Sequence, residues 1–105
     1  MAKNLKLNTL NVRGLGQDLK RKTLASWLSD NHRGVLYLQE THSTDRLLHT
    51  WENDFNCKIF ASHGSTSKAG VAILIPNELP HKINEMITDS EGRYVIVDLT
   101  VYEEQ

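Results

Sequence analysis

The sequence has a single cysteine, Cys57, and only two prolines among its 105 residues. One cysteine excludes an internal disulfide, which favours a reducing, intracellular compartment. The longest apolar run, Val71 to Ile75, is far shorter than the roughly 20 residues that cross a bilayer. Residues 1–4 lack the apolar core of a secretory signal. We therefore expect an intracellular protein with no membrane partner.

An excess of positive charge is also missing, because 12 lysines and arginines stand against 13 aspartates and glutamates, a net charge of −1. Proteins that hold DNA through its phosphates usually carry a basic face. The one basic cluster, Lys20-Arg21-Lys22, fits the solvated face of a helix better than a nucleic-acid patch. Composition alone therefore gives no argument for DNA binding. The length fits one small domain or part of a larger one.

The first forty residues predict a strand, a helix and a second strand. The strands are predicted at residues 5–12 and 35–38, and the helix at residues 18–31, with Gly34 as the glycine that ends it. The helix has an apolar face of Leu19, Leu24, Trp27 and Leu28. Residues 35–38 are all apolar or aromatic, as in a strand of a parallel sheet that is buried on both faces. Together these elements predict a βαβ unit.

The remaining residues predict a second helix and three more strands. Ser43 or Thr44 can cap the helix, and its apolar face is Leu47, Leu48, Trp51 and Phe55. The strands are predicted at residues 58–62, 71–75 and 94–102. The fold class is thus α/β or α+β, with two helices and about five strands. Both helices come early, so the other face of the sheet must be buried against something else.

Two polar residues, Asn11 and Glu40, stand at the carboxyl ends of the two strands of the βαβ unit. Such ends meet at one edge of a parallel sheet, and ligands bind outside it. A carboxylate and an amide at that edge suit Mg²⁺, which takes one or two protein carboxylates and completes its shell with water and phosphate oxygens. The spacing alone leaves open a simpler interpretation, in which both side chains only close loops.

Three stretches carry a resemblance to a known family: residues 9–15 (TLNVRGL), 38–42 (LQETH) and 69–74 (AGVAIL). In this order and at these spacings they resemble the endonuclease domain of LINE-type retrotransposons. That domain is similar to exonuclease III and the apurinic-site endonucleases, within the endonuclease/exonuclease/phosphatase superfamily. The matching motifs run from residue 5 to about residue 102, which is nearly the whole chain.

The resemblance implies that residues 1–105 are the N-terminal half of such a domain. The implied fold is half of a four-layer α/β-sandwich, one mixed sheet of about five strands with two helices on one face. The implied activity is Mg²⁺-dependent cleavage of DNA phosphodiester bonds, with Mn²⁺ as an alternative ion. Glu40 matches a metal ligand of the active site, and Asn11 matches an asparagine that organises metal and phosphate. Arg13 is either a contact to the substrate backbone or a surface arginine without a role.

The rest of the family's catalytic set is expected beyond this chain: a tyrosine on a later strand, an Asp-x-Asn motif and a terminal Asp-His pair. Without these groups nothing activates the attacking water, so we expect negligible nuclease activity from the chain alone. His42 and His63 are expected to be structural or solvated. The bare sheet face is expected to pair with a second copy or with a complementing C-terminal half. Nuclear localisation follows only from the family's substrate, DNA.

Two alternative functions remain open at the level of sequence. One is a non-catalytic, self-associating or binding module derived from a retrotransposon endonuclease. The other is a fragment of a phosphatase-type relative, because members of the superfamily hydrolyse phosphate esters of lipids, inositols and RNA.

Overall fold

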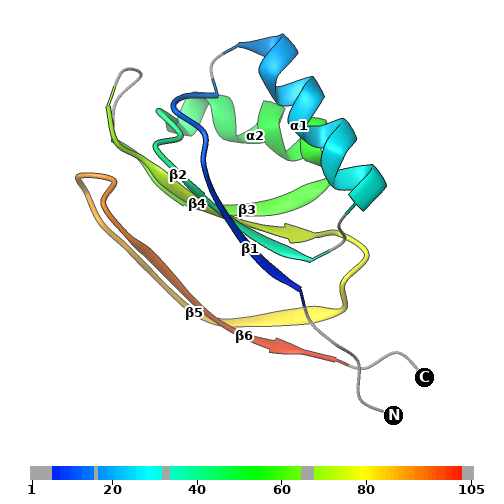
Figure 1. The fold of residues 1–105 in the computed structure, drawn as a ribbon. Helices are drawn as coiled ribbons and strands as arrows, with labels where there is room; N and C mark the ends of the chain where they lie inside the picture. The colour runs from blue at the N-terminus through cyan, green and yellow to red at the C-terminus, as the bar shows by residue number, and fades with distance from the viewer. Residues whose placement is uncertain (1–5, 16, 32–33, 65–67, 103–105) are drawn as a thin grey trace.

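The computed structural model describes residues 6–15, 17–31, 34–64 and 68–102, which form two helices and six strands in two sheets (Figure 1). The elements are β1 (Leu7–Asn11), α1 (Asp18–Asn31), β2 (Val35–Gln39), α2 (Asp45–Phe55), β3 (Cys57–Ser62), β4 (Val71–Pro76), β5 (His81–Thr88) and β6 (Val95–Val101). The predicted α/β class is confirmed. Neither helix in this part of the chain is long and apolar enough to cross a membrane.

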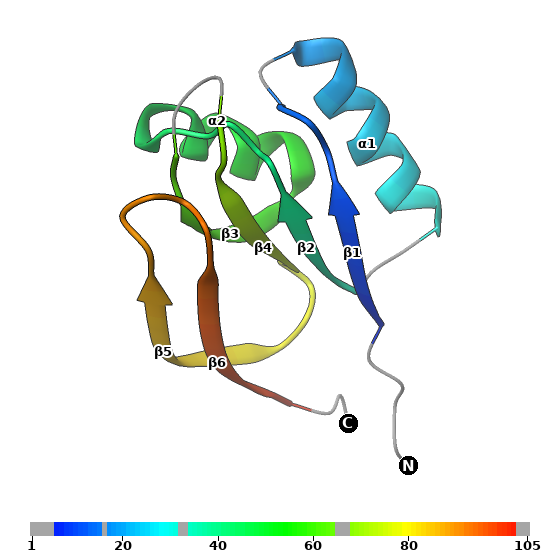
Figure 2. The same ribbon diagram turned by 60° about the vertical axis from the view of Figure 1, so that its left-hand side comes forward.

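The larger sheet has four strands in the order β1-β2-β4-β3. Strands β1 and β2 are parallel, as the βαβ prediction requires, and Asn11 lies opposite Gln39 at their carboxyl ends. Strand β4 is antiparallel to both β2 and β3, so the sheet is mixed. Both helices cover one face of this sheet (Figures 1 and 2).

The core lies between this sheet and α2. Trp51 and Phe55 of the helix are buried against alternate residues of the strands, among them Leu36, Leu38 and Leu74. Each fully buried side chain of this size contributes about 1.5–3 kcal/mol. The predicted apolar face of α2 is thus confirmed for Leu48, Trp51 and Phe55, with Leu48 at the margin of the core. The predictions for Trp27, Leu28 and Leu47 lie outside the described side chains.

Two local predictions about the helices, for Leu19 and Gly34, are wrong, and the predicted cap at Thr44 is confirmed in position only. Leu19 is 77% exposed, because residues five apart lie about 140° from each other around a helix, and Leu24 is the one that packs on the core. Gly34 does not have the left-handed backbone of a helix-ending glycine; a Cβ there would collide with the carbonyl of Lys6. Thr44 is the N-cap of α2 but makes no capping hydrogen bond with its side chain.

The predicted single sheet of about five strands is corrected to two sheets. Strands β5 and β6 form an antiparallel hairpin that packs against β3 and β4, on the face opposite the helices (Figures 1 and 2). Strand β5 has no predicted counterpart, because a bulge between Ile83 and Glu85 interrupts the alternation of apolar and polar residues. The chain therefore covers part of its own sheet with a third layer.

The predicted bare sheet face is accordingly smaller than expected. Where the hairpin covers β3 and β4, the buried residues include Val71 and Ile75 of β4 and Val95 of β6. Under β1 and β2 the face stays open, as a hollow of about 320 Å³ bordered by Leu7, Tyr37 and Ile73 among others. Leu7 is 73% exposed there.

The basic cluster is not a uniformly solvated face, because Arg21 is buried. Its Nε donates to Asp54 Oδ2 at 3.1 Å, and its Nη1 donates to the carbonyl oxygen of Leu15 at 2.6 Å. The guanidinium carbon lies 5.8 Å from the centre of the Trp51 ring, within the range of a cation–π contact. Arg21 therefore ties α1 to α2 and to the loop after β1, whereas Lys20 and Lys22 are exposed.

The turn of the hairpin is anchored by Asp89. Its N–H donates to Ser62 Oγ on β3 at 2.8 Å, and its carboxylate accepts from the backbone N–H and the Nε of Arg93 at 2.8 and 2.9 Å. The side-chain hydrogen bond from Arg93 lowers the pKa of Asp89 to about 2.

A carboxyl group whose pKa is lower in the folded protein stabilises it above the unfolded value, near 4, and loses this contribution as the pH falls toward the folded value. Asp89→Asn should therefore lower the melting temperature at pH 7 and pH 5. The difference from wild type should shrink between about pH 4 and pH 2. Thermal unfolding followed by circular dichroism across this range measures it, with the exposed Asp98→Asn as control. A difference that stays constant with pH would contradict the role given to the carboxylate.

Candidate functional site

Asn11 and Glu40 are in contact at the carboxyl ends of β1 and β2. Asn11 Nδ2 donates to Glu40 Oε2, and Asn11 Oδ1 accepts from the backbone N–H of Arg13 at 3.2 Å. These partners fix the orientation of the amide, because an ionised carboxylate only accepts hydrogen bonds and a backbone N–H only donates. The predicted juxtaposition of amide and acid at one mouth of the sheet is thus found. Asn11 thus joins Glu40 to the loop after β1.

The backbone around this pair is unusually rich in left-handed residues. Those with positive φ are Arg13 (51°), Gly14 (91°), Glu40 (54°), His42 (53°), Ala69 (61°) and Gly70 (94°). Four of the six are not glycine, and such backbone costs about 1–3 kcal/mol a residue unless the surroundings enforce it. Residues of this kind gather at functional sites, so the strain points to the same edge of the sheet as the polar pair does.

Hydrogen bonds between three loops enforce this backbone. Gly14 N–H donates to the Glu40 carbonyl at 2.6 Å, which joins the loop after β1 to the loop after β2. Thr41 N–H donates to the Gly70 carbonyl at 3.0 Å, which joins the loop after β2 to the start of β4. A Cβ on Gly70 would lie 2.5 Å from Thr41 Oγ1, so this close approach requires glycine. The position of Glu40 therefore depends on all three loops.

A row of buried hydroxyl groups continues from Thr41 to His63. Thr41 Oγ1 and Ser43 Oγ are 2.9 Å apart, and Ser43 Oγ is 2.8 Å from His63 Nδ1. Thr41 and Ser43 are almost completely buried, and His63 is half-buried. His63 is thus structural, as expected, and Ser43 serves this network and not the start of α2. Nothing in the sequence marks Thr41 and Ser43 for this role, because their partner lies 20 residues after Ser43.

The donor set at this edge is small. Glu40 is exposed, and the described residues contain no group of three or more His, Cys, Asp or Glu side chains that could hold a metal ion. This does not suit the closed shell of four protein ligands in a structural zinc site. One carboxylate beside an oriented amide is compatible with Mg²⁺, which keeps several water ligands and binds substrate phosphate oxygens. The assignment of Asn11 and Glu40 to a metal stays a prediction.

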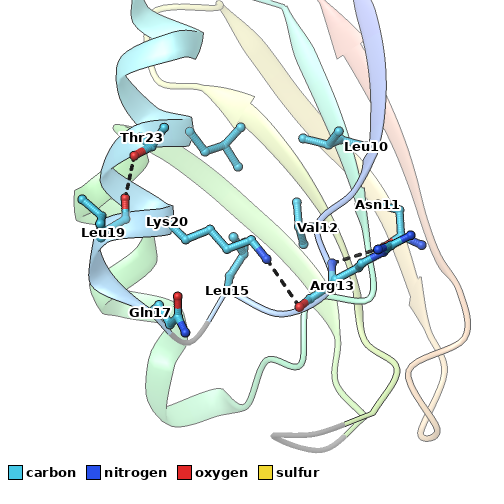
Figure 3. Close-up of a pocket in the computed structure, with 10 residues that line it drawn as sticks. Leu10, Asn11, Val12, Arg13, Leu15, Gln17, Leu19, Lys20 and Thr23 are labelled. Carbon is cyan, nitrogen blue, oxygen red and sulfur yellow. Dashed lines mark hydrogen bonds between the residues drawn. The ribbon is translucent and has the colours of Figure 1, made fainter.

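A cavity of about 770 Å³ opens next to the pair, between the end of β1 and the start of α1 (Figure 3). The described residues that line it are Leu10, Asn11, Val12, Arg13, Leu15, Gln17, Leu19, Lys20, Thr23 and Leu24. Lys20 reaches from the helix toward the loop, where its Nζ donates to the carbonyl oxygen of Arg13 at 3.4 Å. Arg13, predicted to contact substrate, thus lies on the wall of a cavity beside Asn11. Sequence reasoning missed Lys20.

The Asp-x-Asn motif expected only beyond this chain does occur once in it, at Asp54-Phe55-Asn56. Its place in the fold gives these residues a structural role. Asp54 pairs with Arg21, Phe55 is in the core, and Asn56 ends α2 with a left-handed backbone. The triplet is therefore a helix ending and is not the catalytic motif of the resembled family.

No family model matches the chain. The chain is 26% identical over 89 residues to a Xenopus laevis protein described as "Transposon TX1 uncharacterized 149 kDa protein". The aligned part covers 85% of this chain but only 7% of that protein, so the chain spans a small fraction of its relative. The similarity supports a transposon-related protein, which is a coarser statement than the predicted endonuclease family.

Proposed function

We propose that this chain forms the metal-binding half of a transposon endonuclease site, which binds Mg²⁺ and a DNA phosphodiester. The observation that carries the proposal is the contact between Asn11 and Glu40 at the mouth of two parallel strands. The left-handed backbone at the same mouth and the similarity to a transposon protein support it.

In this proposal each of the three residues has a distinct task. Glu40 is the direct metal ligand, since its carboxylate is exposed at the edge of the sheet. Asn11 orients Glu40, because both ends of its amide are already engaged. Arg13 binds the substrate backbone from the same loop. The bound ion would act as a Lewis acid and as a template for the phosphate. We assign no residue of this chain as the base that activates water.

The test is metal binding, measured by electron paramagnetic resonance with Mn²⁺ as the probe. Glu40→Gln should weaken Mn²⁺ binding by at least tenfold, since it removes the charged ligand. Asn11→Ala should weaken it by about tenfold, the usual cost of losing a group that orients a ligand. Glu85→Gln, an exposed change on β5, is the matched control and should bind as wild type does. Equal affinity of wild type and Glu40→Gln would refute the proposal.

Plasmid nicking in Mg²⁺ serves as a second readout of the same site. The chain alone should show no nicking above background, because no water-activating base is assigned to it. Glu40-dependent nicking would instead mean that the chain holds a complete site.

The alternative function is a self-associating module without catalysis. The open hollow under β1 and β2 supports it, because Leu7 is largely exposed there. Such a module associates through the open face whether or not Glu40 is present. Light scattering that finds a monomer at every concentration would exclude it.

A further inference from the structure

The cavity between β1 and α1 has properties that metal binding at Glu40 does not explain. Its volume of about 770 Å³ lies within the range of about 300–1,000 Å³ that small-molecule sites occupy. It starts at Asn11, which holds Glu40, and extends along the first turns of α1 (Figure 3). A molecule attached to a phosphate at Glu40 is therefore adjacent to this cavity.

The walls of the cavity are largely apolar and partly exposed. Leu10 comes from β1 and Leu19 from α1, and they are 41% and 77% exposed. Leu15 and Leu24 line it as well, and both belong to the packed interior or its margin. A concave surface of this kind suits the flat apolar face of a ligand, because covering it removes leucine side chains from water.

The charged side chains among the described residues that line the cavity are cationic, and the carboxylate of Glu40 contacts Asn11 on its wall. The described lining residues include Arg13 and Lys20 but no aspartate or glutamate. The hydrogen bond from Lys20 to the Arg13 carbonyl keeps the ammonium group beside the loop that leads from Asn11. The cavity thus combines apolar walls with cations on the side of the proposed metal site. This combination is complementary to an anion that carries an apolar, flat group.

We propose that this cavity binds the nucleotide next to the phosphodiester that Glu40 and its metal hold. The base lies against Leu10 and Leu19, and Lys20 binds the nucleotide's phosphate. The inference rests on the proposed function and names the substrate class of the same site. A base that is stacked in a duplex cannot enter a cavity, so the substrate nucleotide is an unpaired one. An inositol phosphate lacks the flat apolar face that the leucines would cover.

The experiment is an NMR titration of the full chain without metal, with thymidine 5′-monophosphate as the probe. We expect the amide signals of the residues lining the cavity to shift, and inorganic phosphate and inositol 1-phosphate to shift them much less. Lys20→Gln should weaken nucleotide binding by about five- to tenfold, the loss of one charge-assisted contact. Lys22→Gln, an exposed change on the same helix, should leave it unchanged.

Leu19→Glu supplies a second variant that is expected to fold, because Leu19 is exposed. It places a negative charge at the cavity and should abolish nucleotide binding. Equal shifts with phosphate and nucleotide, shifts elsewhere in the protein, or wild-type affinity in Lys20→Gln would each overturn the inference. Nucleotide binding should persist in Glu40→Gln. A failure of metal binding, which would refute the proposed function, can therefore be distinguished from a failure of nucleotide binding, which would refute this inference.

Discussion

Arg21→Met should lower the free energy of unfolding by about 2–4 kcal/mol, although Arg21 belongs to a cluster of basic residues on a helix. Removing one partner of a buried ion pair costs about 3–5 kcal/mol when the other charge is left unpaired. The cost is reduced here because the side chain of Asp54 is 30% exposed and water can solvate it. The carbonyl of Leu15, a fully buried residue, also loses its charged donor.

Urea unfolding measured against Lys22→Met tests this prediction. Lys22 is exposed on the same helix, so its replacement should change stability by no more than about 0.5 kcal/mol. Asp54→Asn combined with Arg21→Met completes a double-mutant cycle, which separates the ion pair from the contact with Leu15. Equal stability of Arg21→Met and Lys22→Met would show that Arg21 does not hold the helices together.

Gly70→Ala should lower stability by about 2–4 kcal/mol and weaken Mn²⁺ binding by about 10- to 100-fold. Gly70 has a φ of +94°, which L side chains rarely adopt, and a Cβ there would lie 2.5 Å from Thr41 Oγ1. Thr41 is completely buried, so it can yield only by moving the turn that carries Glu40. Displacing the support of a metal ligand typically costs that range of affinity.

Gly34→Ala is the matched control for Gly70→Ala. A Cβ on Gly34 would collide with the carbonyl of Lys6, so this change should also destabilise the fold. Gly34 directly precedes β2, at the end of the strand opposite Glu40. Under conditions where both variants are folded, Gly34→Ala should bind Mn²⁺ within about twofold of wild type. Similar losses of affinity in both variants would mean that the loops do not specifically position Glu40.

Both predictions depend on the same property of this small fold, namely that its loops are joined to one another. The loop after β1 is bonded to Glu40 through Gly14 and to α1 through Arg21 and Leu15. A change in any of the three loops is thus expected to alter the position of Glu40. This explains how Glu40, an exposed carboxylate, can be held in a defined place.

The sequence predicted the elements that rest on local patterns. Apolar residues at helical spacing gave α2 its buried face, and the apolar run at residues 35–38 gave β2, buried on the helix side by Leu36 and Leu38. The contact of Asn11 with Glu40 was also predictable, because parallel neighbouring strands must bring their carboxyl ends to one edge. The role of these residues in binding metal and substrate stays a prediction.

Other features came from contacts that no local pattern encodes. Strand β5 was not predicted, because its bulge interrupts the alternation of apolar and polar residues on which strand prediction depends. Arg21 was expected to be exposed to solvent. Its partner Asp54 lies 33 residues later, and the basic cluster does not indicate that the two side chains form an ion pair. The structural role of the Thr41 and Ser43 hydroxyl groups likewise depends on a distant residue, His63, which completes their row of hydrogen bonds.

By itself, then, the sequence determined two helices, most of the strands and the edge of the sheet at which Asn11 contacts Glu40. These follow from periodicity and from the geometry of a βαβ unit, both of which act over a few residues or one crossover. Only the tertiary structure decided that the last strands form a separate covering layer, that a basic residue is buried, and that a cavity opens beside the acid. Each of these depends on which distant segments pack together, and free energies of burial and desolvation decide that only once the chain is folded.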